Sequence, residues 1–354
     1  MIYHLAQYIQ QHWSVCNILH YVSVRAIASL LSTLIFAFVF GNWFIEKSKR
    51  WFRAKARAWT PDSHKLKDDM PTMGGVFILS LVFLNALLWC DLSRPHVWVL
   101  LLCLLLFGAI GAWDDWCKIN RRAGINASSK FWLQVVCATL VVIAWLYTTG
   151  ASTTVTVPFF KHFNPDLGFF FIPWAVFIII GCSNAVNLTD GLDGLAIGSL
   201  MPNFLTFSLI AYLAGHMQFA HYLCIPYAAT AEVAVIGATL IGASLGFLWY
   251  NAYPAQIFMG DVGSLALGAG LACMALMAKQ EFLLLLAGGL FVVETVSVIA
   301  QVISFKYFGR RILKMAPLHH HFELLGCPEA KISVRFGIIS LILCLLALIT
   351  LKIR

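Results

Sequence analysis

Aspartates gather in three short polar segments of an otherwise apolar chain. Asp114 and Asp115 follow one long apolar run, residues 184–194 follow a second, and Asp261 lies in a glycine-rich stretch after a third. Adjacent carboxylates repel each other unless a cation lies between them or one of them is protonated. If the three segments meet in space, they form a site for a hard divalent cation, and magnesium suits a site of few carboxylates and substrate phosphates.

Basic residues and histidines accompany these segments. Lys67 lies near the start of an apolar run, and the triplet His319, His320 and His321 lies in the last long polar loop. Consecutive residues point in different directions in a helix or a strand, so three adjacent histidines rarely bind one metal together. Hydrogen bonding to a phosphate or a base is the more natural use, and a solvated loop is the alternative. Phosphoryl transfer needs mainly positioning and charge neutralisation, which such residues can provide.

The elements that must position these residues are membrane spans. Hydrophobic residues make up 60% of the 354 residues and charged residues 11%, against about 25% charged in a soluble domain. We therefore predict an all-α, polytopic integral membrane protein with a single membrane domain, residues 1–354. A span needs about 20 mainly apolar residues, which predicts about ten transmembrane helices, at about 22–45, 72–90, 97–113, 131–148, 171–187, 195–214, 227–248, 264–279, 282–305 and 333–350.

The distribution of basic residues predicts the orientation. If the loop 46–70 faces the cytoplasm, 17 Lys and Arg residues lie on that side and 5 on the other, with Arg25 and Arg335 inside or at the edge of spans. The positive-inside rule favours this topology, which places both termini outside the cytoplasm and the acidic segments at the cytoplasmic surface. The net charge of +8 then reflects loops that face an anionic leaflet, and no nucleic acid is expected as a partner.

Several residues leave two interpretations open. Asp190 and Asp193, spaced by glycines, offer acceptors to a sugar or a base, but they also suit an ordinary turn that caps the next helix. Phe258, three positions before Asp261, can stack on a flat base or belong to an aromatic belt at the membrane interface. Glu294 lies within an apolar run, and we expect it to be paired structurally inside the bundle.

Five motifs, in order along almost the whole chain, resemble the polyprenyl-phosphate N-acetylhexosamine-1-phosphate transferases. They are Pro71-Thr72-Met73-Gly74-Gly75, Asp114-Asp115, Asn187-Leu188-Thr189-Asp190-Gly191-Leu192-Asp193-Gly194, Phe258-Met259-Gly260-Asp261-Val262-Gly263-Ser264 and Pro317-Leu318-His319-His320-His321-Phe322-Glu323. The last motif resembles the muramoyl-pentapeptide branch of the family rather than relatives that use UDP-N-acetylglucosamine. One departure is Asp69-Met70, where the family usually has Gly-Thr.

The resemblance implies transfer of phospho-N-acetylmuramoyl-pentapeptide from UDP-N-acetylmuramoyl-pentapeptide to undecaprenyl phosphate, with release of UMP, at the cytoplasmic side of a bacterial inner membrane. It implies Mg²⁺ bound by Asp261, Asp114 as the base that deprotonates the lipid phosphate, and Asp115 as a positioning or metal-supporting residue. The implied nucleotide and sugar pocket comprises Asn187, Asp190, Asp193, Asn251, Phe258, Gln301, His319, His320 and His321, and the implied phosphate contacts are Lys67, Thr72 and Lys118.

Alternatives to this interpretation remain at this point. A sister transferase that uses UDP-N-acetylglucosamine shares the chemistry, a nucleotide-sugar transporter would place its site near the bilayer midplane, and a scaffold of cell-wall assembly would need no chemistry at all. Attack on the donor by the lipid phosphate, which we favour, and a route through a phospho-aspartate are both compatible with the residues. The sequence leaves the oligomeric state open, a homodimer included.

Overall fold

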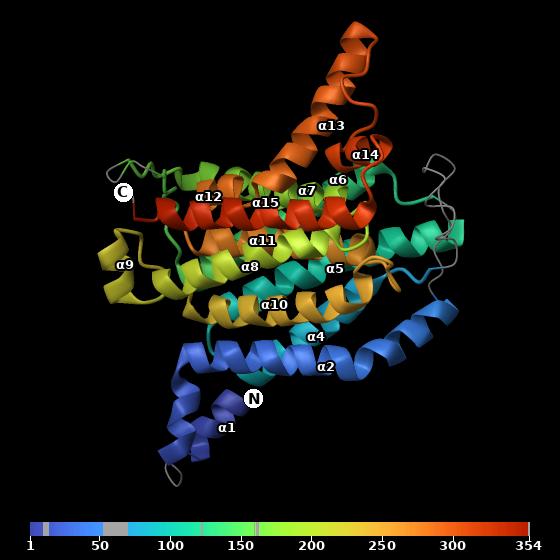
Figure 1. Cartoon of the computed structure of the whole chain (residues 1–354). Coiled ribbons are helices and arrows are strands. Elements are labelled where there is room, and N and C mark those ends of the chain that lie inside the picture. The colour runs from blue at the N-terminus through green and yellow to red at the C-terminus, as the bar shows by residue number, and fades with distance from the viewer. Residues whose placement is uncertain (10–13, 52–69, 122, 159, 161–162, 353–354) are drawn as a thin grey trace.

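The protein is a bundle of long helices (Figure 1). The computed structural model describes residues 1–352 except 10–13, 52–69, 122, 159 and 161–162, and no β-strand occurs in this part of the chain. An isolated bridge pairs Thr154 with Asp166. The helices are α1 (Ile2–Ile9), η1 (Ser14–His20), α2 (Val22–Trp51), α4 (Gly74–Trp89), α5 (Pro95–Arg121), α6 (Ala127–Thr149), η2 (Gly168–Phe170), α7 (Phe171–Thr189), α8 (Leu195–Ala214), α9 (Met217–Leu223), α10 (Ala231–Asn251), α11 (Gly260–Met277), α12 (Glu281–Ala287), α13 (Gly289–Phe308), α14 (Leu318–Leu324) and α15 (Glu329–Thr350).

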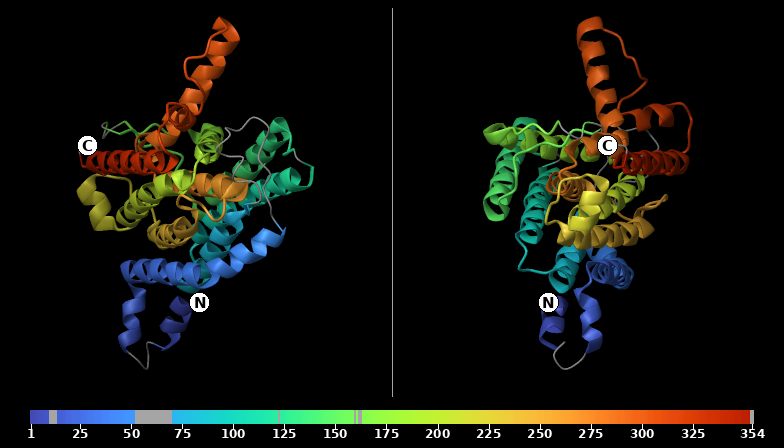
Figure 2. Two further views of the ribbon diagram at one scale, coloured as in Figure 1. Left: turned by 45° about the vertical axis from the view of Figure 1, so that its right-hand side comes forward. Right: turned by 90° about the vertical axis from the view of Figure 1, so that its left-hand side faces the viewer.

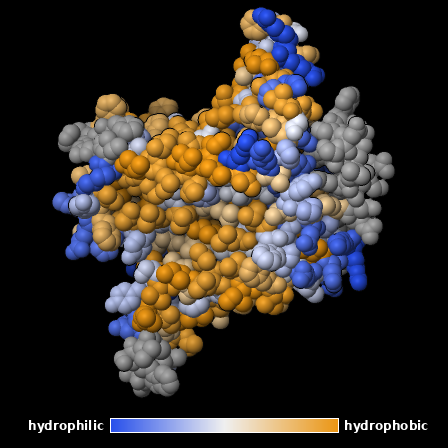
Figure 3. All heavy atoms as spheres, in the orientation of Figure 1, coloured by the Kyte–Doolittle hydropathy of each residue, from blue (hydrophilic) through white to orange (hydrophobic). Residues whose placement is uncertain are grey.

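The bundle has the dimensions and surface of a membrane protein. Among the described residues, nine helices are long and apolar enough to cross a bilayer, and α4, with 16 residues, is a shorter apolar helix. Figure 3 shows a broad hydrophobic surface along these helices, with hydrophilic residues gathered toward their ends. The predicted all-α, polytopic architecture is thereby confirmed, and each of the ten predicted segments corresponds to a helical region.

The centre of the bundle is α11, which packs against α4, α5, α7 and α8. Small residues allow these helices to approach closely, as is common where helices pack within membranes. A Cβ atom added to Gly75 of α4 would lie 2.0 Å from the backbone nitrogen of Gly263, and one added to Gly111 of α5 would lie 2.2 Å from the carbonyl oxygen of Asp261. The backbones of α4 and α5 therefore touch the first turn of α11.

The prediction of one continuous span over 282–305 is wrong. The chain breaks at Gly288 into the short helix α12 and the longer helix α13. In Figures 1 and 2 the far half of α13 leaves the bundle and projects away from it. Adjacent glycines at 288 and 289 give the backbone the freedom for this change of direction, which hydropathy alone does not reveal.

Met1 and Lys352, the first and last described residues, lie at the end of the bundle opposite the acidic segments. The amino group of Met1 donates to the carbonyl oxygen of Leu87 near the end of α4 (2.5 Å), and Lys352 donates to the carbonyl oxygen of Tyr222 in α9 (2.9 Å). A buried ion pair also lies at this end, where Arg25 of α2 meets Glu232 of α10 through two hydrogen bonds of 2.7 and 2.6 Å.

Candidate active site

Three carboxylates from two helices meet at the other end of the bundle. Asp114 and Asp115 belong to α5, Asp261 lies in the first turn of α11, and one oxygen from each lies within 4.8 Å of the others. Asp114 and Asp115 are only 3% and 4% exposed. The pair had been expected to end its span, but α5 continues to Arg121. The two carboxylates therefore lie inside a helix, against the backbone of α11, rather than in solvent.

Two lysines bind this acidic cluster. Lys118, on the same face of α5, places its Nζ 2.8 Å from Asp114, 3.2 Å from Asp115 and 2.7 Å from Asp261. Lys130, in the first turns of α6, lies 3.3 Å from Asp114 and also contacts Asp261. Three carboxylates face two ammonium groups, so the cluster keeps one net negative charge in the absence of any cation.

The turn between α5 and α6 brings Lys130 to the cluster. The backbone N–H of Ile125 donates to Asp114 Oδ1 at 2.7 Å, and Asn126 caps α6 by accepting from the N–H of Ser128. Since Asp114 anchors the turn and Asn126 starts the next helix directly after it, Lys130 points back toward α5. The turn is part of the site, although it carries none of the recognised motifs.

The motif around residues 71–75 lies beside the acidic cluster. Its backbone pairs with the start of α11, because the N–H of Phe258 donates to the carbonyl oxygen of Pro71 and the N–H of Gly74 donates to that of Phe258, both at 2.9 Å. Gly260 has a φ of +73°, and a Cβ atom there would lie 2.5 Å from Asp115 Oδ2 and 3.1 Å from Thr72 Oγ1. The structure thus brings Thr72 next to Asp115, with Phe258 half-buried nearby.

The last turn of α7 and the loop after it reach the same site. Asn187 donates to the hydroxyl of Ser264 in α11 at 2.8 Å. Asp190 follows the last residue of α7, and burial together with the charges of Asp261 and Asp115 raises the pKa of its carboxyl group to about 8. The negative charges of the acidic cluster therefore favour the protonated form of Asp190.

Asp193 and Asn251 connect the loops that border the site. Asp193 Oδ2 accepts the backbone N–H of Ala255 at 3.0 Å. Asn251 accepts the N–H of Gly194 (3.1 Å) and donates to the carbonyl oxygen of Ile257 (2.8 Å). Both side chains are buried, so the structure places them between the loop after α7 and the loop before α11, where they hold the two loops together.

The histidine triplet forms part of the short helix α14, and its members point in different directions. His319 is fully buried, with Nδ1 3.2 Å from Glu294 Oε2. His320 pairs with Glu323 at 3.0 Å, and Nδ1 of His321 accepts the N–H of Lys314 at 3.1 Å. The expectation that the three side chains do not converge on one metal agrees with this geometry.

His319 links α13 to the loop after α7. Glu294 of α13 accepts the N–H groups of Leu318 (2.8 Å) and His319 (3.2 Å), so its carboxylate also caps α14. On the other side, a Cβ atom added to Gly191 would lie 2.3 Å from Nε2 of His319. Glu294 is paired and buried, as expected, but its partner is the histidine motif rather than another bundle helix.

One predicted site residue, Gln301, stands apart from this cluster. The amide of Gln301 accepts the N–H groups of Ile312 and Leu313 and donates to the carbonyl oxygen of Leu313, each at 3.0 Å, so the structure places it under the turn that follows α13. Lys67 lies outside the described residues.

Sequence reasoning missed Lys130 and the turn that carries it. In the sequence, Lys130 counts only as one of the basic residues that determine topology. Its position in the first turns of a helix that follows the Asp114-Asp115 motif by a short loop was the available signal, since such a connection brings the start of one helix next to the end of the other.

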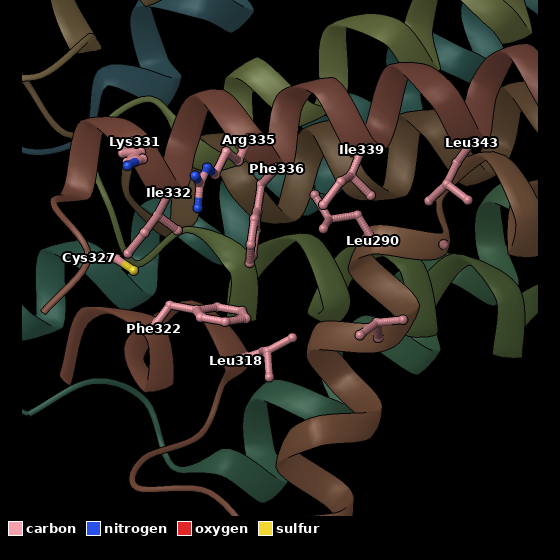
Figure 4. Close-up of a pocket in the computed structure, with 12 residues that line it drawn as sticks. Leu290, Leu318, Phe322, Cys327, Lys331, Ile332, Arg335, Phe336, Ile339 and Leu343 are labelled. Carbon is pink, nitrogen blue, oxygen red and sulfur yellow. The ribbon is translucent and has the colours of Figure 1, made fainter. Parts of the chain in front are cut away.

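An apolar pocket adjoins the loop after α7 (Figure 4). Its volume is about 360 Å³, and its lining comprises Gly289, Leu290, Val293, Leu318, Phe322, Cys327, Lys331, Ile332, Arg335, Phe336, Ile339 and Leu343. Leu192 and Leu195 pack with Leu290, Ile332 and Phe336 in one buried cluster. The pocket therefore lies beside the acidic cluster rather than in it, with the loop after α7 between them.

The acidic cluster fits a hard divalent cation. Its donors are carboxylate oxygens, the ligand type that magnesium prefers, and its net negative charge leaves room for a cation that arrives with an anionic substrate. Asp261 is the least enclosed of the three carboxylates. Asp114, Asp115 and Asp261 are the residues that could hold such an ion.

Comparisons with known proteins agree with this geometry. The profile of glycosyl transferase family 4 matches residues 97–279, a region that includes the acidic cluster and both lysines. Proteins named phospho-N-acetylmuramoyl-pentapeptide-transferase are 48% identical in Solidesulfovibrio magneticus, 47% in Citrifermentans bemidjiense and 46% in Aquifex aeolicus, and in each case the alignment covers 100% of both chains. The chain belongs to the phospho-N-acetylmuramoyl-pentapeptide-transferase family, within glycosyl transferase family 4.

Proposed function

We propose that this protein transfers phospho-N-acetylmuramoyl-pentapeptide from UDP-N-acetylmuramoyl-pentapeptide to undecaprenyl phosphate and releases UMP. The single observation that carries the proposal is the convergence of Asp114, Asp115 and Asp261 with Lys118 and Lys130 at one end of a membrane bundle. Carboxylates that can hold a cation, next to ammonium groups that can meet phosphates, are what transfer between a sugar nucleotide and a phosphorylated lipid requires.

The donor would occupy the loops around the acidic cluster. Asn187 in the last turn of α7 and Asp190 directly after this helix border the cluster. Phe258, half-buried beside Thr72 and Gly260, can stack on uracil. We infer that Asp193 and Asn251 act on this pocket mainly by holding its two loops in register, because their polar atoms already bind backbone groups.

The acceptor's hydrocarbon chain would lie in the apolar pocket between α13, α14 and α15. The pocket adjoins the loop that carries Asp190, and it borders α13, whose apolar side chains Val293, Val296 and Ile299 are exposed. Lys331 and Arg335 are its charged lining residues (Figure 4). An apolar channel with cations at its edge suits a long lipid that ends in phosphate.

The chemistry we infer is a single displacement. The acceptor phosphate oxygen attacks the phosphorus bonded to the sugar, the bond from that phosphorus to the bridging diphosphate oxygen breaks, and UMP leaves with the electron pair. Asp114 would take the acceptor's proton, and Lys118, Lys130 and the N–H of Ile125 hold its carboxylate in place. Magnesium bound by Asp261, with Asp115 in support, would neutralise charge on the diphosphate.

The test combines purified protein, UDP-N-acetylmuramoyl-pentapeptide and undecaprenyl phosphate, and measures UMP with and without magnesium. We expect metal-dependent UMP release that is lost in Asp261→Asn. UMP release without the lipid acceptor, together with a phosphorylated Asp114 or Asp115, would replace the direct route by the phospho-aspartate route. Faster release from UDP-N-acetylglucosamine would assign the protein to the sister activity, and no release from either donor would refute the proposal.

The setting follows from the basic residues. We infer a multi-pass protein of a bacterial inner membrane with the acidic cluster on the cytoplasmic side, because Lys118, Lys130 and the basic end of α2 share that end of the bundle. Antibody or protease access to tags at either terminus in intact and opened cells tests the orientation. Native mass spectrometry of the detergent-solubilised protein measures whether it forms a homodimer.

A further inference from the structure

The far end of α13 and the turn after it form an exposed tip that stands away from the bundle. We call residues 305–312 the α13 tip. In Figures 1 and 2 this end of α13 has no helix beside it. Its large apolar side chains are exposed: Phe305 by 58%, Tyr307 by 71%, Phe308 by 68% and Ile312 by 63%.

The tip is an ordered structure rather than a loose loop. Gln301 binds the backbone of Ile312 and Leu313 through three hydrogen bonds, and Ser304, which is buried, donates to the carbonyl oxygen of Arg310 at 2.8 Å. Gly309 ends α13 with a φ of +65°. The turn is therefore folded back against the helix and presents its side chains in a fixed arrangement.

The tip combines three exposed cations with three exposed aromatic side chains, Phe305, Tyr307 and Phe308, which we call the aromatic collar. Lys306, Arg310 and Arg311 are exposed, and among the described residues none of them has a carboxylate partner. Two of them contact rings within the tip: Lys306 Nζ lies 5.8 Å from the Tyr307 ring centroid, and the Arg311 guanidinium carbon lies 5.9 Å from that of Phe305. Figure 3 shows hydrophilic side chains at this end of α13 above a hydrophobic shaft.

We propose that the α13 tip binds the headgroups of anionic phospholipids in the leaflet next to the acidic cluster. The tip leads directly into α14, whose His319 lies against Gly191, so it belongs to the same end of the protein as the cluster. Aromatic side chains with cations at the end of an apolar helix suit the headgroup region. Free phosphate would satisfy the cations but would leave the collar in water, which favours a lipid as the occupant.

The test measures lipid binding to the full-length protein by native mass spectrometry, with phosphatidylglycerol and phosphatidylcholine as probes. Each cation near an anionic surface contributes roughly fivefold to binding. We expect the wild-type protein to bind phosphatidylglycerol more tightly than phosphatidylcholine, and the variant K306Q/R310Q/R311Q to lose about tenfold or more in its affinity for phosphatidylglycerol alone. The single variant R310Q, with an expected loss of roughly fivefold, serves if the triple variant does not fold.

A matched control separates the tip from net charge. The variant K47Q/K49Q/R50Q removes the same charge from the exposed end of α2. Since the proposal assigns the headgroup site to the tip, this variant should lose less affinity for phosphatidylglycerol than the tip variant. An unchanged affinity in the tip variants would overturn the proposal, and so would an equal loss in the α2 control. If millimolar inorganic phosphate displaces the lipid from the wild-type protein but not from the tip variant, the tip is a phosphate site instead.

Discussion

Gly260 lets α11 start against the acidic cluster, and Gly260→Ala tests that geometry. The backbone there has a φ of +73°, which costs an L residue about 1 to 2 kcal/mol. The new Cβ atom would lie 2.5 Å from Asp115 Oδ2, and an ordinary contact of 3.4 Å requires the carboxylate to retreat by about 0.9 Å. A displacement of about 1 Å at a catalytic group lowers the rate by about 100-fold, or about 2.7 kcal/mol.

The assay is UMP release at saturating and limiting donor, together with thermal unfolding in detergent. Gly150→Ala is the matched control, because Gly150 ends α6 with a φ of +60° and no heavy atom lies within 4 Å of the position of its Cβ atom. Both variants should lose stability through the positive φ, and Gly260→Ala should lose more through its contact with Asp115. Only Gly260→Ala should lose about 100-fold in kcat/KM. The reasoning is refuted if Gly260→Ala keeps more than half the wild-type kcat/KM, or if the control loses as much.

Three further outcomes follow from single contacts. Lys130→Met should lower kcat/KM by at least about tenfold and Lys130→Arg by less, measured as UMP release; equal activity in all three proteins would contradict its place in the site. In metal-free buffer, the unfolding temperature should fall as the pH rises from about 4 to 8. The folded protein keeps the proton of Asp190 up to a pKa of about 8, whereas the unfolded chain loses it near pH 4. Asp190→Asn should make the unfolding temperature depend less on pH, and an unchanged dependence would contradict the role of Asp190. Arg25→Met should cost about 3 to 5 kcal/mol by leaving Glu232 buried without its partner, and adding Glu232→Leu should restore part of the lost unfolding temperature.

The sequence was sufficient to predict the helices and the gathering of the acids at one end of the bundle. Long apolar runs predict spans because each buried backbone group must be satisfied within its own helix. The acidic segments follow every second predicted span, and alternate spans end on the same side of a membrane. Asp114 and Asp261, 147 positions apart, were expected at one surface on this basis. Their contact at one point depended on the small residues that bring α5 and α11 together.

Three features escaped prediction for physical reasons. The extension of α5 past Asp115 was hidden because polar residues usually mark the end of a span, yet Lys118 and Lys130 neutralise these acids and allow the helix to continue. The break at Gly288 was hidden because hydropathy does not change with the direction of a helix. The role of Lys130 depended on a tertiary contact that no pattern within its own segment records.

The helix α14 couples the two parts of the proposed reaction through its two faces. Leu318 and Phe322, four positions apart and thus on one face, line the apolar pocket, while His319 on another face lies against Gly191 beside Asp190. Glu294 caps this helix from α13, whose direction is set by the break at Gly288. A lipid chain that displaces α13 or α14 from within the pocket would therefore also move the loop next to the acidic cluster. Because the carboxylate of Glu294 is the direct link, loss of that cap should weaken binding of the sugar nucleotide before it alters the lipid pocket itself.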